Sequence, residues 1–438
     1  MLDSVSLRKR QAIEELSARH EEPMWLLQHR LKAWRLYEDM LPPTGREEEW
    51  RRTDVSALSL DGLTLFAPAT LSPRLRGGLR EGRDGYGGQI VQRDSQIVFQ
   101  EMRPESAEQG VIFTDLHSAA RQHPKVIRRH FMTEAVLPAA WKYVALHAAL
   151  WSGGAFLYVP AGVEIGVPLH AVVGLSSGGV AVFPHTLIVA EEGSSVTLIE
   201  EHGSSDGDRR ALSSAVVEIL VRDGAQVRYV GVQDWGANVD SFSTIRAVLG
   251  KGSQLELGLV GSGGHVAKAS LDAVLSAPGA TASIVGLFLA EGDQHMSYST
   301  LQDHRAANTT SDLLFKSVLR DNAYLVWNGL TRIHKGAGES DANQSSRNLL
   351  LGENARVAAI PVLEIEAHDV TRCSHGATVS SVDEEQLYYM MSRGLTREDA
   401  SRAIVDGFLR QGLERLTSLQ AHRGIGRSVE RRLLAEVA

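Results

Sequence analysis

The residues best suited to chemistry in this sequence are a cysteine and a histidine two positions apart, Cys373 and His375. Cys373 is the only cysteine among 438 residues, and its neighbours in the stretch EAHDVTRCSHGAT are mostly polar. Alternate residues of a strand point to the same face, so the thiol and the imidazole would project side by side. Such a pair can be a nucleophile with its base, or two ligands for iron or zinc. In the other interpretation, the cysteine packs in the core as a small apolar side chain.

A metal site built on this pair would be incomplete, because two ligands are too few for tetrahedral coordination. The metal hypothesis therefore needs further groups, supplied by this chain or by a partner. His368 and His334 are the candidates within the chain. Each is also readily explained as an ordinary solvated or hydrogen-bonded histidine.

Asp303 and His304 are another close pair of residues suited to chemistry, in the later part of the chain. A carboxylate beside a histidine suits general acid and base catalysis. An enzyme of this kind should gather carboxylates or a histidine base on one face of a repeated structure, and one pair is weak support. We keep an enzyme acting on carbohydrate or acyl substrates as the alternative hypothesis.

Motifs for several other chemistries are missing from the sequence. Gly250-Lys251-Gly252 is the nearest approach to a phosphate-binding loop, and it lacks the earlier glycine and the hydroxyl. There is no C-x-x-C and no H-E-x-x-H. The sequence therefore gives no support to a nucleotide hydrolase, a zinc ribbon or a zincin.

Composition narrows the class of protein further. The net charge of −8 and the pI near 6.1 give no general electrostatic footprint for nucleic acid. A single cysteine cannot form an internal disulfide, and the first residues, MLDSVSLRKR, lack the apolar core of a signal peptide. No stretch approaches the run of about 18 apolar residues that spans a bilayer. We expect a cytoplasmic protein that contacts neither nucleic acid nor membrane.

Short apolar runs separated by glycine-containing turns fill the chain from about residue 155. A phrase of Gly or Asn, a small residue, any residue and an apolar residue recurs there, starting at Gly154, Gly193, Gly224, Gly252, Gly279, Asn322 and Asn354. Gly and Asn most readily adopt the left-handed backbone of a tight turn. From Gly193 to Gly279 the steps are 31, 28 and 27 residues. A turn and strand repeated at this length predicts a solenoid with its turns aligned at one edge.

The competing fold is an antiparallel β-sandwich, which also has many short strands and regular turns. The repeated turn phrase and the length of the β region favour a β-helix. We therefore predict a mainly β protein in which residues 151–378 form the β-helix core. Residues 1–150 are predicted to be mostly helical, and residues 379–438 to form a C-terminal helical region.

Helix signals lie at both ends of the chain. Apolar residues recur at helical spacing over residues 25–40, before Pro42, and over residues 118–131 with an interruption at Pro124. We expect these helical ends to cap the stack of coils, as the open ends of a solenoid require.

Two C-terminal helices are predicted from their caps. Asp383 is the expected N-cap of the first and Gly394 its end, and a capping box over residues 396–399 opens the second. One face of the second helix is predicted to pack against the end of the solenoid through Ala400, Ile404 and Phe408. Charged positions left for a partner are Arg397, Glu398, Arg402 and Asp406.

The C-terminal part of the sequence, from Asn343 to Phe408, resembles the signature of the SufB/SufD family of iron–sulfur cluster assembly proteins. It contains NQSSRNLLLGENARV, PVLEIEAHDVTRCSHGATVSSVDEEQLYYMMSRGL and REDASRAIVDGF. Upstream, WKYVALHAALWSGGAFLYVPAGVEIGVPL resembles the start of the family's core. The N-terminal EEPMWLLQHRLKAWRLYEDM and PPTGREEEWRRTDVSAL, with the form CSHGAT around the cysteine, are most similar to the SufD branch.

The resemblance implies a right-handed parallel β-helix between helical regions, in agreement with the repeat. It implies a non-catalytic scaffold subunit that pairs with a SufB-like protein through the β-helix, or with a second copy of itself where that partner is absent. It also implies that a SufC-like ABC ATPase binds the C-terminal helices and that no nucleotide binds this chain. Cys373 and His375 match family positions at the SufB interface, as metal ligands for a transient iron–sulfur cluster shared with the partner.

Overall fold

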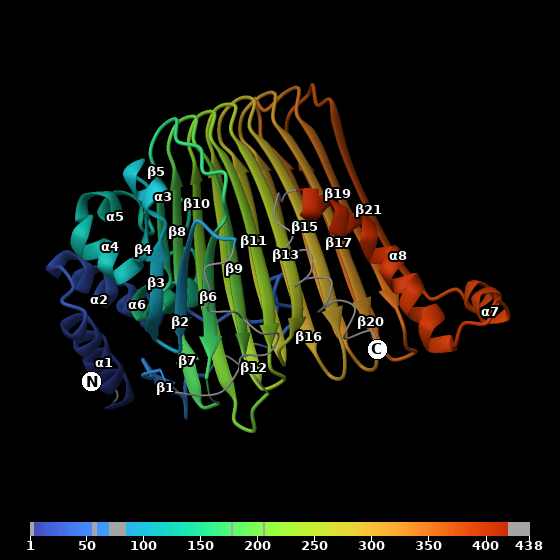
Figure 1. The fold of residues 1–438 in the computed structure, drawn as a ribbon, viewed down its shortest axis with the longest axis horizontal. Coiled ribbons are helices and arrows are strands. Elements are labelled where there is room, and N and C mark those ends of the chain that lie inside the picture. The colour runs from blue at the N-terminus through green and yellow to red at the C-terminus, as the bar shows by residue number, and fades with distance from the viewer. Residues whose placement is uncertain (1–3, 55–58, 70–84, 177, 205, 419–438) are drawn as a thin grey trace.

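The computed structural model of the chain describes residues 4–54, 59–69, 85–176, 178–204 and 206–418. Its centre is a β-solenoid of about eight turns, in which each turn contributes one strand to each of two facing sheets (Figure 1). Helices flank the solenoid at its two ends in the sequence. The mainly β class is confirmed, and the antiparallel sandwich is excluded because neighbouring strands of the solenoid run parallel.

The residues before the solenoid form short helices and strands. In chain order they are α1 (Ser4–Arg19), α2 (Met24–Asp39), β1 (Thr64–Leu65), β2 (Gly88–Arg93), β3 (Gln96–Met102), α3 (Pro104–Glu108), β4 (Ile112–Asp115), α4 (Leu116–Gln122), α5 (Pro124–His130) and α6 (Lys142–Leu150). The helix expected over residues 25–40 is α2, and the pattern over residues 118–131 divides at Pro124 into α4 and α5. Both helical predictions are confirmed.

The two sheets of the solenoid take alternate strands along the chain. Sheet A contains β5 (Ala155–Val159), β7 (Val180–Val182), β8 (His185–Ala190), β10 (Ala211–Val221), β12 (Val239–Leu249), β14 (Val266–Leu275), β16 (His295–His304), β18 (Tyr324–Ile333) and β20 (Arg356–Ile365), with β1 and β4. Sheet B contains β6 (Leu169–Leu175), β9 (Ser195–Ser204), β11 (Gln226–Trp235), β13 (Gln254–Gly263), β15 (Thr281–Ala290), β17 (Thr310–Leu319), β19 (Asp341–Leu350) and β21 (Arg372–Ser381), with β2 and β3.

The strands stack in one register from coil to coil. In sheet B, Tyr229 lies beside Leu257, which lies beside Ile284, and all three side chains are buried. Alternation along each strand gives every coil an inward apolar row, so each coil covers the row of the one before it. The division of the chain at residues 150 and 378 stays a prediction, and strands β2, β3 and β4 of the N-terminal region also pair into the two sheets.

The recurring turn phrases fall into two columns, so the prediction of a single edge was partly wrong. Those at Gly193, Gly224, Gly252 and Gly279 precede consecutive strands of sheet B, with φ between 61° and 76°. A Cβ on Gly279 would lie 3.5 Å from the Cα of Gly252, because the turns stack closely. The phrases at Asn322 and Asn354 instead precede strands of sheet A, which begin at the opposite edge. At the first of these, the left-handed residue is the preceding Asp321, with φ 56°.

The N-terminal helices pack on the outer face of sheet A. Leu26 and Trp34 of α2 and Leu146 of α6 share one buried cluster with Leu187 and Leu220 of the sheet. The strands beneath are therefore buried on both faces, which explains why all of ALSSAVVEILV in β10 is apolar or small apart from Glu218.

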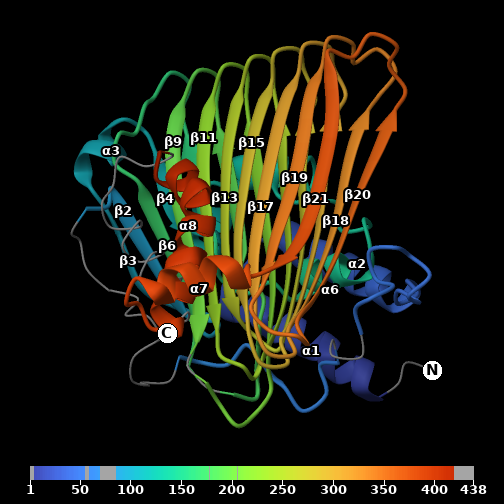
Figure 2. The ribbon, with the colours of Figure 1, turned by 90° about the vertical axis from the view of Figure 1, so that its right-hand side faces the viewer.

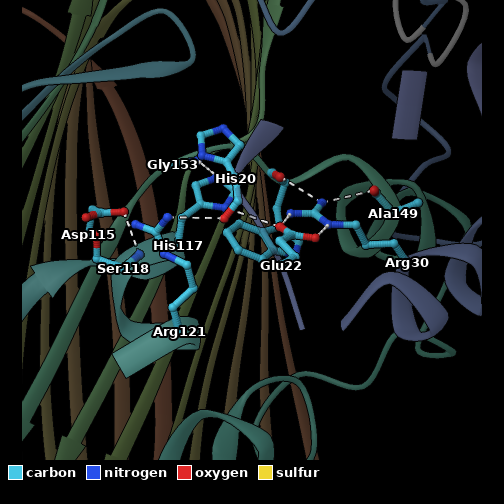
Figure 3. Close-up of polar contacts among 10 residues, drawn as sticks. His20, Glu22, Arg30, Asp115, His117, Ser118, Arg121, Ala149 and Gly153 are labelled. Atoms are coloured by element: carbon cyan, nitrogen blue, oxygen red, sulfur yellow. Dashed lines mark hydrogen bonds and ion pairs between the residues drawn. The ribbon is translucent and has the colours of Figure 1, made fainter. Parts of the chain in front are cut away.

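A buried polar network joins α2 to the end of α6, just before the first strand of the solenoid (Figure 3). The Arg30 side chain is fully buried and forms two hydrogen bonds to the Glu22 carboxylate, at 2.6 and 2.9 Å. It also donates to the carbonyl oxygens of Ala149 and Trp151. The Arg30 guanidinium lowers the pKa of Glu22 well below its usual range, against the opposing effect of burial. Glu22 and Arg30 are therefore both ionised, and their charged groups are hydrogen-bonded. A buried ion pair needs such bonds to offset the loss of water around it.

The C-terminal helices α7 (Glu384–Ser392) and α8 (Arg397–Ser418) have the predicted caps. Asp383 Oδ1 accepts from the Glu385 amide, and Thr396 Oγ1 accepts from the Asp399 amide at 3.0 Å. Gly394 has φ 97° just beyond α7.

The predicted packing of the second C-terminal helix against the end of the solenoid was wrong. Figure 2 shows α8 lying across the outer face of sheet B, while β20 and β21 form an uncovered end. The most deeply buried face of α8 beyond Ala400 comprises Val405, Leu409, Leu413 and Leu416. Ile404 and Phe408 pack only partly against the same cluster. Sheet B has an outward apolar stripe that includes Val230, Val285 and Leu287, and α8 covers it because water would otherwise contact it.

Candidate functional site

The last coil of the solenoid, β20 and β21, ends both sheets (Figure 2). Most of its residues are exposed or half-buried, whereas the strands of the preceding coils are largely buried. Three large apolar side chains stand exposed on it, namely Val362, Ile365 and Val379, each between 41% and 47% exposed. An uncovered strand pair carrying exposed apolar residues is a ready surface for a further chain.

Cys373 and His375 lie on β21, as the strand argument expected. They pair in register with Ala342 and Gln344 of β19, both of which are buried. Alternation along the strand therefore directs the thiol and the imidazole to the same, inward side of sheet B at its open end.

The two side chains differ in their surroundings. Cys373 is half-buried against an apolar cluster that contains Ile333 and Ala342, and burial raises the pKa of its thiol. His375 is exposed. A thiol in this setting becomes a thiolate ligand when a cation displaces its proton. The Cys373 thiol thus lies at the border between the core and the exposed end of the solenoid.

The other two histidines considered at sequence level are not joined to this pair in one cluster. His334 Nε2 lies 2.8 Å from Asp303 Oδ1 on the adjacent coil, and His368 is exposed in the turn before β21. Across the described ranges, no group of three or more His, Cys, Asp or Glu side chains is arranged to hold a metal ion. Cys373 and His375 therefore offer two ligands at an open surface.

The pair considered for the alternative enzyme, Asp303 and His304, has structural partners. Asp303 contacts His334 and pairs with Arg305 at 2.7 Å. The His304 ring is buried and lies 2.7 Å from Ser311 Oγ and 2.8 Å from Thr309 Oγ1. Successive residues of a strand point to opposite faces, so the two side chains cannot serve one site. The geometry does not favour a β-helix enzyme.

An apolar surface on α7 was missed at sequence level. Tyr388 is 75% exposed and Tyr389 59% exposed, and Met391 and Leu395 are exposed beside them. The signal was the run YYMM within a helix, because four consecutive large residues cannot share one buried face. The charged positions expected to be available to a partner also form exposed ion pairs within the chain, as Arg397 with Glu384, Arg402 with Glu398, and Asp406 with Arg410. Their use by a partner stays a prediction.

No helix in the described part of the chain is both long and apolar enough to cross a membrane. The fold and its last coil define a β-solenoid protein with an open, partly apolar end that carries a thiol and an imidazole.

Comparison with known proteins gives the family. The model of the SUF system FeS cluster assembly SufBD core domain matches residues 173–408, and that of the SufBD protein N-terminal region matches residues 91–171. The chain is 34% identical over 406 residues to the iron-sulfur cluster assembly protein SufD of Bacillus subtilis, covering 91% of both chains. It is 31% identical over 415 residues to SufB of the same organism, covering 91% of this chain and 88% of that one. The chain belongs to the SufBD family of iron–sulfur cluster assembly proteins.

Proposed function

We propose that this protein is a non-catalytic scaffold subunit of a SUF-type iron–sulfur cluster assembly complex, most like SufD. The single observation that carries the proposal is the open last coil, where Cys373 and His375 present two potential iron ligands beside exposed apolar residues. Membership of the SufBD family supplies the chemistry, which is the assembly of iron–sulfur clusters.

The partner at this end would be a SufB-like β-solenoid. Cys373 and His375 would hold one side of a nascent cluster, and the partner would supply the remaining ligands, because two protein ligands cannot complete iron coordination. The cluster is cargo in this scheme, held while the two chains are together. Val362, Ile365 and Val379 would be covered by the partner and would contribute the apolar area that such contacts bury. A second copy of this chain could occupy the same end.

The second partner would be a SufC-like ABC ATPase. The exposed aromatic residues Tyr388 and Tyr389 of α7 are the part of the C-terminal helices best suited to dock it, because tyrosines anchor many protein interfaces. Nucleotide would then bind and be hydrolysed on that separate chain. The further role proposed for this chain is to carry the ATPase beside the site of cluster assembly.

Co-purification from native lysate tests the proposal. An affinity-tagged full-length chain should bring down an ABC-type ATPase and a second SufBD-family protein, and the complex should contain iron and acid-labile sulfide. Isolation of the chain with neither partner, or hydrolysis of a carbohydrate or acyl substrate by the chain alone, would contradict it.

A further inference from the structure

A polar groove runs between α8 and the outer face of sheet B. Its volume is about 260 Å³, and it lies over β17 and β19 on one side and beside β21 on the other. Ser345 and Gly376 provide small floor positions, and a Cβ on Gly376 would meet no atom within 4 Å, so the space above it is open. Gln411 and Arg415 of α8 form the opposite wall.

Three polar side chains that line the groove have no partner in the described part of the chain, namely Ser345, Arg347 and Gln411. They offer a hydroxyl, a guanidinium and a carboxamide, all of which can donate hydrogen bonds. The three converge from two separate elements, β19 and α8, on one space. Side chains arranged in this way are suited to a ligand with several acceptor oxygens.

The charge around the groove is positive and poorly balanced. Arg347 lies in register beside Lys316 of β17, and like charges on adjacent strands repel. Burial lowers the pKa of Lys316, and the neighbouring Arg347 and Arg415 lower it further. The ammonium group donates to the Phe408 carbonyl and lies over the Phe408 ring, and neither contact neutralises its charge.

One carboxylate lines the groove, and its oxygens are already engaged. Asp312 accepts a hydrogen bond from Asn343 Nδ2 at 2.8 Å and pairs with the Arg415 guanidinium. The Asp312 carboxylate offsets one of the three cationic side chains, Lys316, Arg347 and Arg415. These four residues together keep a net charge of about +2. An anion in the groove would relieve the repulsion between Lys316 and Arg347.

We propose that this groove binds a phosphate-class oxyanion. Arg347 and Arg415 would hold its oxygens, and Gln411 and Ser345 would donate to the remaining ones. A carboxylate has two oxygens and cannot use all these donors, whereas a phosphate has up to four and a diphosphate more. The volume is large enough for a diphosphate. The site lies on the outer face of sheet B and is also bordered by His375, but its oxyanion donors are other residues, so the proposal does not depend on the proposed scaffold function.

Isothermal titration of the full-length chain with inorganic phosphate and with pyrophosphate, at low ionic strength, tests the site. We expect saturable binding with pyrophosphate the tighter ligand, weakened by added sodium chloride because the contacts are partly exposed. Arg347→Ala should weaken binding by about tenfold or more, since it removes a charge-assisted contact. Gln411→Ala should weaken it less.

Arg410→Ala is the matched control, because Arg410 is an exposed arginine next to Gln411 on α8 that pairs with Asp406 and does not line the groove. It makes the same change in net charge and should leave affinity within about twofold. Equal weakening by Arg410→Ala, the absence of saturable binding for both phosphate probes, or displacement of pyrophosphate by equimolar acetate would each overturn the proposal.

Discussion

The carboxyl oxygen Oε1 of Glu218 lies 3.1 Å from Nε2 of His185, and both side chains are fully buried beneath the N-terminal helices. His147 Nδ1 lies 2.9 Å from the Ser214 carbonyl and so carries a hydrogen, which leaves its Nε2 to accept from His185 Nδ1 at 3.0 Å. If His185 is neutral, its Nε2 is then an acceptor and Glu218 carries the proton between them. Burial fits this assignment, because it raises the pKa of Glu218 from 4.5 to about 8 and lowers that of His185 to about 3.

The first prediction concerns stability against pH. A carboxyl whose pKa is raised in the folded protein keeps its proton there between pH 4.5 and about 8, while the unfolded chain releases it. The contribution of Glu218 to the free energy of unfolding should therefore fall as pH rises through this window, by a few kcal/mol in total at about 1.4 kcal/mol per pKa unit. Urea denaturation of the wild type and of Glu218→Gln at several pH values measures it.

The variant separates this effect from other titrating groups. The carboxyl oxygen Oε1 also accepts from the Met132 amide, and a protonated oxygen can donate and accept where an amide nitrogen cannot. Glu218→Gln should therefore be less stable than wild type near pH 5 by about 1 kcal/mol, and this deficit should shrink or reverse by pH 8. A deficit that stays constant with pH would show that Glu218 is ionised in the fold.

The second prediction concerns Cys373 and His375. If they are cluster ligands, Cys373→Ala and His375→Ala should sharply reduce the iron and sulfide of the purified complex, because a site with few ligands has none to spare. The melting temperature should change little for His375→Ala, whose side chain is exposed. Cys373→Ala should lower the free energy of unfolding more, by about 1 kcal/mol, because the Cys373 thiol packs against the cluster of Ile333 and Ala342.

Ser374→Ala is the control for this pair. Ser374 lies between the two residues on β21 and points to the other face, where its hydroxyl contacts Asn343 at 2.9 Å. The complex purified with Ser374→Ala should contain as much iron as the wild-type complex. Unchanged iron in both Cys373→Ala and His375→Ala would contradict the ligand hypothesis, and Cys373 would then be explained as a partly buried core residue.

The third prediction concerns the ATPase dock. Removing residues 384–438 is a poor test, because Val405, Leu409, Leu413 and Leu416 of α8 cover sheet B and their burial contributes on the order of 5–10 kcal/mol. Tyr388→Ala combined with Tyr389→Ala instead removes exposed side chains and should leave the fold intact. This double variant should lose most ATPase binding in a pull-down.

Leu41→Ala is the control for the dock, because Leu41 is 85% exposed and lies at the N-terminal end of the chain. It removes apolar surface of similar exposure and should retain full ATPase binding. If the tyrosine variant binds as well as this control, the ATPase docks elsewhere on the chain.

The fourth prediction concerns the Arg30 network of Figure 3. Arg30→Met should destabilise the fold by about 3–5 kcal/mol, because it leaves the buried Glu22 carboxylate without its partner. Arg10→Met, which breaks an exposed pair with Glu14 on α1, should cost less than about 1 kcal/mol. Thermal unfolding of the two variants compares them, and similar melting temperatures would contradict the prediction.

The sequence by itself determined the features that depend on local chemistry. Glycines at steps of about one coil marked the turns of the solenoid, since few other residues adopt a positive φ. Asp383 and Thr396 marked the starts of α7 and α8, because an N-cap is satisfied by amides two or three residues away. The two-residue spacing of Cys373 and His375 determined that they share a face of a strand.

Only the tertiary structure decided the features that depend on contacts between distant residues. The buried face of α8 is set by an outward apolar stripe that successive coils build together, so no single strand of sheet B revealed it. In the sequence, Glu218 is only a polar residue within an apolar strand. In the fold, His185 and the backbone amides of Met132 and Val136 supply its hydrogen-bond partners. The groove at Arg347 likewise exists only where α8 lies over β17 and beside β19, because Arg347 and Gln411 are 64 residues apart in the chain and folding alone brings them together.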